Sequence, residues 1–197
     1  MIGTFLSLLL YNIPKYAMDG MLSAEYQTYY SILFMPAFVV TLFCEFVFRP
    51  TITNIANYWF SGEFKRFKRT VLLNLGSLVA DAVFVTLAGH YIGRFLLEIL
   101  YGVDLSAYKA HFIVLLIGGG AGACVYMLYN ILIAIRHSGS IKIVYTITTV
   151  ISIFCARPLI SRYSMMGAAL SYLLSGLLLL ISFSTILLII SCKKHVK

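Results

Sequence analysis

Long apolar runs separated by short polar stretches dominate the pattern of this 197-residue chain. Residues 111–135 and 165–191 contain no Asp, Glu, Lys or Arg, and residues 70–92 contain only Asp81. At 1.5 Å of rise per residue, a helix of any of these lengths crosses a hydrocarbon layer of about 30 Å. Because strands of a membrane barrel would alternate apolar and polar residues, these continuous runs predict helices.

Three weaker runs complete the predicted set of spans. Residues 28–48 are long enough to span the membrane and contain one acid near their end. Residues 142–160 span it only if the basic residues near both ends reach the lipid headgroups. Residues 2–19 form a short run. We therefore expect an all-α integral membrane protein, a single bundle over residues 1–197 with about six transmembrane helices, the first of them truncated. The approximate spans are 2–19, 28–48, 70–92, 111–135, 142–160 and 165–191.

Composition and charge agree with a lipid environment. The chain is 61% hydrophobic and 11% charged, whereas soluble domains carry about 25% charged residues. Ten of the fifteen Lys and Arg residues lie in 49–69, in 136–142 and after Ser191, and the alternate connections 15–27, 92–110 and 157–163 hold five. The positive-inside rule then predicts that both termini are cytoplasmic. Since topology accounts for the net charge of +8, we expect no nucleic-acid partner.

A glycine run, Gly118–Gly122, resembles a dinucleotide fingerprint in spacing, but it lies inside an uncharged span with no strand before it. Close helix packing is the preferred interpretation. The small and polar residues expected to share packing stripes are Gly119, Gly122, Tyr126 and Asn130 in this span, and Gly167, Ser171, Ser175 and Ser182 in the last one. The Cys and His residues lack metal-binding spacing, so we expect no cofactor, no metal and no catalytic residue.

Asp81 lies near the middle of its predicted span, and Asn74 and Ser77 share its face at i−7 and i−4. A lone carboxylate facing lipid costs several kcal/mol, so we expect this face to point inward. Two interpretations remain open. The residue belongs to a cavity or a coupling-ion site, or it forms a protonated or hydrogen-bonded lock between helices.

Two pairs of opposite charge lie one turn apart. Glu45 and Arg49 can pair along one helix face, as can Lys15 and Asp19. Pro50 follows Arg49 and predicts a helix boundary or a kink there. An interfacial salt bridge and a role in binding explain the Glu45–Arg49 pair equally well.

An ordered series of phrases covers nearly the whole chain: NIPKYAMDG, YSILFMPAFVVTLFCEFVFRP, NYW before SGEFKRFKR, ILYGVDLSAYK and YSMMGAALSYLL. This series resembles the second half of bacterial flippases that transport lipid-linked oligosaccharides. The family includes flippases for polysaccharide, for O-antigen and for teichoic-acid-type units. Those proteins belong to the multidrug/oligosaccharidyl-lipid/polysaccharide exporter superfamily. The resemblance implies two helical bundles around a central cavity in a protein about twice this long, of which this chain would be the C-terminal bundle.

The resemblance also implies a function in cell-envelope synthesis. A transporter of this kind moves polyprenyl-pyrophosphate-linked oligosaccharide across the bacterial cytoplasmic membrane, as in lipopolysaccharide assembly, by alternating access. Lys15 and Arg49 match charged positions of the family pattern and are candidates for contact with the anionic headgroup. The implied partners are the lipid bilayer, the lipid-linked oligosaccharide and an N-terminal bundle.

Three alternatives remain. An ion-coupled drug exporter of the same superfamily would favour an acidic or aromatic cavity. A membrane glycosyltransferase or polymerase would need a constellation of carboxylates or histidines in a sizeable polar loop, which the connections lack, so we expect no enzyme. The chain could also be an inactive fragment unless a second bundle covers the face that carries Asp81.

Overall fold

The computed structural model describes residues 2–195, with the side chains of residues 5–42, 47–93 and 95–191. These residues form helices and connections without a strand. The α-helices are α1 (Ile2–Met18), α2 (Ala24–Phe60), α3 (Phe64–Ala88), α4 (Arg94–Tyr101), α5 (Lys109–Ala134), α6 (Ser138–Tyr163) and α7 (Met165–His195). A π-helical segment, Gly89–Gly93, joins α3 to α4, and a 3-10 turn, Ser106–Tyr108, precedes α5.

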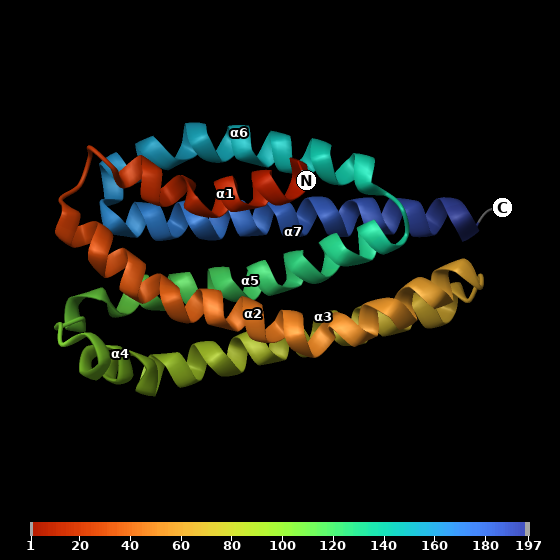
Figure 1. Cartoon of the computed structure of the whole chain (residues 1–197), viewed down its shortest axis with the longest axis horizontal. Helices are drawn as coiled ribbons and strands as arrows, with labels where there is room; N and C mark the ends of the chain where they lie inside the picture. The colour runs from red at the N-terminus through yellow and green to blue at the C-terminus, as the bar shows by residue number, and fades with distance from the viewer. Residues whose placement is uncertain (1, 196–197) are drawn as a thin grey trace.

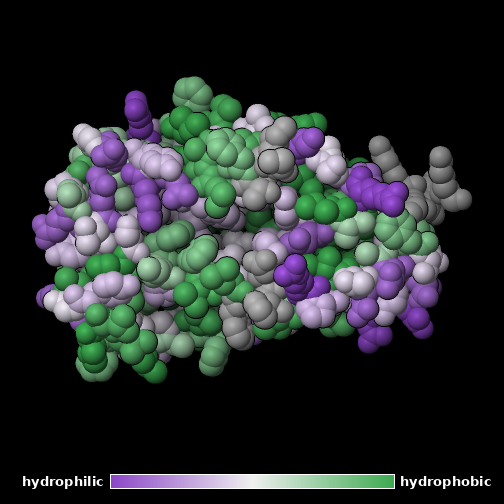
Figure 2. Space-filling model, in the orientation of Figure 1, coloured by the Kyte–Doolittle hydropathy of each residue, from purple (hydrophilic) through white to green (hydrophobic). Residues whose placement is uncertain are grey.

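The long helices lie side by side in an elongated bundle, and the chain reverses direction at each connection between them (Figure 1). The α2–α3 and α5–α6 connections lie at one end together with the end of α7, and the α1–α2 and α6–α7 connections lie at the other with α4. Hydrophilic side chains gather at both ends of the face in Figure 2, while hydrophobic ones cover much of its middle. This distribution is typical of a bundle whose ends meet water and whose waist meets hydrocarbon.

Among the described residues, four helical segments are long and apolar enough to cross a membrane: 64–93, 106–134, 138–163 and 165–191. The bent α2 makes a fifth if its two parts count as one span. The first predicted span is a helix of 17 residues, or about 26 Å, which is shorter than the hydrocarbon layer. Length and composition therefore support a multi-pass membrane protein with four or five spans, where the sequence predicted about six.

Two further expectations needed correction. The predicted span at 28–48 is part of a longer helix, since α2 continues through Pro36 and Pro50 to Phe60. The helix does not end at Pro50, but its parts 24–42 and 47–60 meet at 42°. Pro50 has no N–H to donate to the carbonyl four residues earlier, so a kink just before it has a physical cause. The second correction is that the predicted connection 92–110 contains α4.

Helix α5 is the centre of the bundle and packs against α2, α3 and α7. In the most apolar window of residues 106–134, 72% of the residues are buried, against 11% for residues 64–93. The same kind of apolar sequence therefore forms the core in α5 and a largely exposed surface in α3. Helices α6 and α1 both pack against α7, and α6 also makes a small contact with α5.

The glycine run of α5 lets three helices approach the centre, which confirms the packing interpretation. A Cβ atom on Gly118 would lie 2.5 Å from the Tyr172 ring of α7, and one on Gly119 would lie 2.7 Å from the backbone oxygen of Ala37 in α2. A Cβ atom on Gly120 would collide with the side chain of Ala82 in α3. Each of these glycines thus admits a different neighbour.

Small hydroxyl residues join α6 to α7 inside the bundle. The hydroxyls of Ser152 and Ser175 are 2.7 Å apart and buried, and Ser175 also donates to the backbone oxygen of Ser171. The packing stripe predicted for the last span is confirmed at Ser175, which meets Ser152 of α6. It is also confirmed at Gly167, where a Cβ atom would collide with the backbone of Leu159.

We expect a modest coupling between these two serines. Hydrogen bonds between helices in membranes contribute about 0.6 kcal/mol on average. A double-mutant cycle of Ser152→Ala and Ser175→Ala, followed by unfolding in mixed micelles, should give a coupling free energy of that size. Strictly additive effects would contradict a bond between the two hydroxyls.

Candidate functional site

Asp81 lies in an open groove on the surface of the bundle. The groove has a volume of about 690 Å³ and is formed by α2, α3 and α4. Its other lining residues are Met35, Pro36, Val39, Val40, Phe84, Val85, Leu97, Leu100 and Tyr101. Asp81 is exposed on the surface of this bundle, and the expectation that its face points toward a cavity between two bundles stays a prediction.

The interhelical lock is not found among the described residues. The described hydrogen bonds and ion pairs do not include the Asp81 carboxylate, and the side chains that line its groove are apolar except for the Tyr101 hydroxyl. A carboxylate in such surroundings needs a cation, a hydrogen-bond donor or water as its partner. The cavity interpretation therefore remains a prediction, and the groove is the place where a ligand could reach it.

The polar face of α3 continues toward its N-terminus but turns partly inward. The Ser77 hydroxyl donates to the backbone oxygen of Asn74 at 3.0 Å. Asn74 is half-buried, and its Nδ2 atom is buried without a hydrogen-bond partner among the described residues. Asn74 and Asp81 share a helix face as predicted, yet the groove that contains Asp81 does not include Asn74.

Lys15 has an aromatic partner. Its Nζ atom lies 5.5 Å from the centre of the Phe34 ring, which is within the range of a cation–π contact. The Phe34 ring meets the Tyr172 ring edge-on at 5.0 Å, and Tyr172 lies 6.0 Å from Tyr11. Asp19 is exposed, and the described side chains include no ion pair between it and Lys15. The sequence left open whether Lys15 faces Asp19 or a substrate phosphate, and in this structure its described partner is Phe34 and not Asp19.

This aromatic cluster, formed by Tyr11, Phe34 and Tyr172, could not be recognised from the sequence. Its members come from α1, α2 and α7, and no local spacing connects them. The only sequence signal was that Tyr11 precedes Lys15 by one helical turn and therefore shares its face. The cluster holds the ammonium group of Lys15 at a half-buried position against an apolar wall.

The second predicted pair cannot be placed in the same way. Arg49 is exposed on α2, which keeps its guanidinium accessible to a ligand or to headgroups. The side chain of Glu45 lies outside the described residues, so the Glu45–Arg49 pair stays a prediction. Lys15, Arg49 and Asp81 do not line one common pocket among the described ones.

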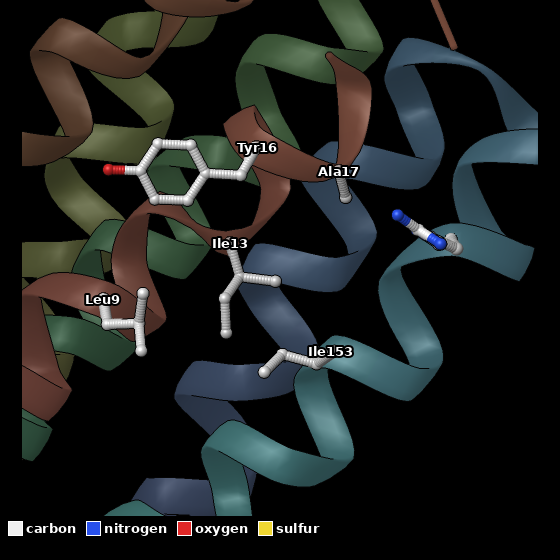
Figure 3. Close-up of a pocket in the computed structure, with 6 residues that line it drawn as sticks. Leu9, Ile13, Tyr16, Ala17 and Ile153 are labelled. Carbon is white, nitrogen blue, oxygen red and sulfur yellow. The ribbon is translucent and has the colours of Figure 1, made fainter. Parts of the chain in front are cut away.

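A smaller hollow of about 240 Å³ lies between α1 and α6. Leu9, Ile13 and Ala17 of α1 and Ile153 of α6 line it (Figure 3), and Tyr16 and Arg157 complete its wall. The residues of α1 are one helical turn apart, so the stripe could have been read from the sequence, but its partner on α6 could not. Sequence reasoning placed Arg157 only as the end of a span.

Among the described residues, no group of three His, Cys, Asp or Glu side chains could hold a metal ion. No family model matches the chain, and no curated protein and no solved structure matches it either. Function is therefore inferred from the fold and from the residues of the groove and the aromatic cluster. They describe an all-helical chain in which several helices are long and apolar enough to cross a membrane, with an open, acid-bearing groove on its surface.

Proposed function

We propose that this chain is one helical bundle of a two-bundle membrane transporter. The observation that carries this proposal is the exposed face of α3, where an apolar helix long enough to span the membrane presents Asp81 to the outside of the bundle. A carboxylate at that depth is costly against lipid. A second bundle facing α3 and α2 would turn the groove into an internal cavity and remove that cost.

The proposed substrate is a polyprenyl-pyrophosphate-linked oligosaccharide, which the transporter flips across the bacterial cytoplasmic membrane for surface polysaccharide or O-antigen synthesis. The sequence resemblance supports this substrate class. A pyrophosphate and a glycan cannot enter hydrocarbon unaided, so the protein must offer cations and polar groups in a cavity that opens alternately to each side. The proposed orientation has both termini in the cytoplasm, where the basic connections then also lie.

Lys15 is the proposed phosphate contact. The Phe34 ring covers one side of its ammonium group without accepting conventional hydrogen bonds from it, and the group has three donors to offer. Phe34 thus positions the charge and leaves its N–H groups free for phosphate oxygens. Arg49, which is exposed on α2, is the second proposed contact.

We expect Lys15→Ala and Arg49→Ala to lower transport in a complete transporter that contains both bundles. Losing one charge-assisted hydrogen bond should lower the rate about tenfold, while the amount of protein in the membrane stays the same. The measurement is movement of a fluorescent polyprenyl-pyrophosphate oligosaccharide across proteoliposomes. Lys142→Ala, an exposed cation on α6, is the control. Normal rates in both test variants would rule out these two contacts.

The groove itself favours a second candidate, an ion-coupled exporter of organic cations from the same superfamily. Its lining combines one carboxylate with aromatic and aliphatic side chains, including Phe84 and Tyr101, and it contains no cationic residue. Such a lining suits an amphipathic cation. Accumulation of a fluorescent organic cation in cells distinguishes this candidate, because a flippase for an anionic lipid would not change it.

A further inference from the structure

A groove between α3 and α7 runs from the basic end of the bundle toward its middle. It has a volume of about 300 Å³ and is separate from the Asp81 groove. Its lining residues are Phe67, Lys68, Val71, Leu72 and Leu75 of α3, Leu128 of α5, and Ser184, Leu187, Leu188 and Ser191 of α7. Because α3 and α7 run in opposite directions (Figure 1), Lys68 and Ser191 lie at the same end of the groove.

The groove therefore changes character along its length. At its outer end lies Lys68, which is flanked by the exposed residues Lys65, Arg66 and Arg69. The only acid in this stretch, Glu63, pairs with Arg66 at 2.7 Å, so three cations are left without a local counter-charge. Further in, the walls are Val71, Leu72, Leu75, Leu187 and Leu188.

The rim of the groove is open to the surroundings of the bundle. Leu72 is 69% exposed and Leu188 is 65% exposed, whereas Leu128 at the floor is fully buried. A molecule in the surrounding hydrocarbon can therefore enter from the side, between α3 and α7. Its polar end would then lie at Lys68 and its apolar end along the leucines.

We propose that this groove binds an anionic phospholipid, with its phosphate at Lys68 and one acyl chain between α3 and α7. The charge at the outer end selects an anionic headgroup over a zwitterionic one. The lining has a cation at one end and aliphatic side chains along the rest, which matches a phosphate with an attached acyl chain. The proposal does not depend on the proposed transport function.

The test is native mass spectrometry of the whole purified chain in detergent with equal amounts of phosphatidylglycerol and phosphatidylcholine. We expect phosphatidylglycerol to be retained about tenfold better, the effect of one charge-assisted contact. Lys68→Gln should reduce its retention to the level of phosphatidylcholine. Lys142→Gln, which removes an exposed cation outside the groove, should leave the preference unchanged.

The acyl-chain part of the site needs its own variant. Ser184→Phe fills the groove and should lower retention of both lipids, whereas Thr185→Phe, on the exposed neighbouring position, should not. If Ser184→Phe elutes as an aggregate, Leu188→Phe narrows the groove from its exposed rim instead. The proposal would be overturned if the two lipids bound equally, or if Lys68→Gln and Lys142→Gln lowered phosphatidylglycerol retention equally. Full lipid retention by the variant with the filled groove would also overturn it. A lipid-free dimer that Ser184→Phe dissociates would also overturn it, since the occupant would then be a second copy.

Discussion

Gly119→Leu is expected to destabilise the bundle by about 1 to 3 kcal/mol, the usual cost of forcing a larger side chain into a packed contact. A Cβ atom at this position would already lie 2.7 Å from the backbone oxygen of Ala37 and 2.9 Å from its Cα atom. Backbone atoms cannot move aside as a side chain can, so α2 has to separate from α5. The hydrogen bond from the Thr41 hydroxyl to the Gly119 oxygen, 3.3 Å long, would be lost as well.

The matched control for this variant is Gly76→Leu on α3. Apart from the backbone of its own helix and its chain neighbours, no atom lies within 4 Å of where a Cβ on Gly76 would be, so the new side chain meets only the surroundings. Both substitutions gain the same helix propensity, about 0.8 kcal/mol, and their difference isolates the packing term. The measurement is the free energy of unfolding in mixed micelles, followed by circular dichroism. Equal unfolding free energies for the two variants would contradict the close α2–α5 contact.

Asp81→Leu is expected to abolish transport by the complete transporter without lowering the amount of protein in the membrane. On insertion scales an aspartate at the centre of a span raises the free energy of membrane insertion by about 2.5 to 3.5 kcal/mol. Replacing it with leucine should therefore not impair insertion. Asp81→Asn keeps the size and removes the charge, and it should lose most of the activity if ionisation is what matters. Transport is measured with both the oligosaccharide lipid and an organic cation, which separates the two candidate substrates.

Ala80→Leu is the control for the Asp81 variants. Ala80 is exposed on the same turn of α3 but does not line the groove, so added bulk there should leave transport intact. Undiminished transport of both substrates by Asp81→Leu would show that the groove has no part in the function. A loss of protein from the membrane would instead place Asp81 in the interface with the second bundle.

Much of the fold could be predicted from local patterns. The positions of the helices follow from uninterrupted apolar runs, since a backbone in hydrocarbon must satisfy its hydrogen bonds within the helix. The packing role of Gly119 and Ser175 follows from the same reasoning, because small residues within a leucine-rich span serve little purpose unless another helix approaches them. These are properties of one helix and its solvent, and they can be read without knowing the neighbours.

The length of the helices was harder to predict. The helix α2 passes through Pro50 because the preceding residues can bend and tolerate one missing N–H donor. The segment that forms α4 looked like a connection, since it is short and contains both charged and apolar residues. Helices at the edge of a membrane need no uninterrupted apolar run, so hydropathy alone does not reveal them.

The candidate site shows where sequence reasoning stops. Lys15 was identified as a candidate with either Asp19 or a substrate phosphate as its partner, but the contact that the structure describes comes from the next helix, at Phe34. An exposed pair of opposite charges contributes only about 0.3 to 0.5 kcal/mol on a helix surface, so it is easily replaced by a tertiary contact. The face of Asp81 was identified correctly as polar, but the groove that contains Asp81 is formed with residues of α2 and α4 that no local spacing connects to it.

By itself the sequence determined that the chain is a set of apolar helices, which residues share a face, and which connections are rich in basic residues. Only the tertiary structure decided that α5 is central and α3 peripheral, that Lys15 meets Phe34, and that Asp81 opens into a groove. The physical reason is that hydropathy describes how a helix interacts with its solvent. In hydrocarbon, lipid and protein neighbours are almost equally apolar, so which helix covers which depends on the fit of side chains brought together from distant parts of the chain.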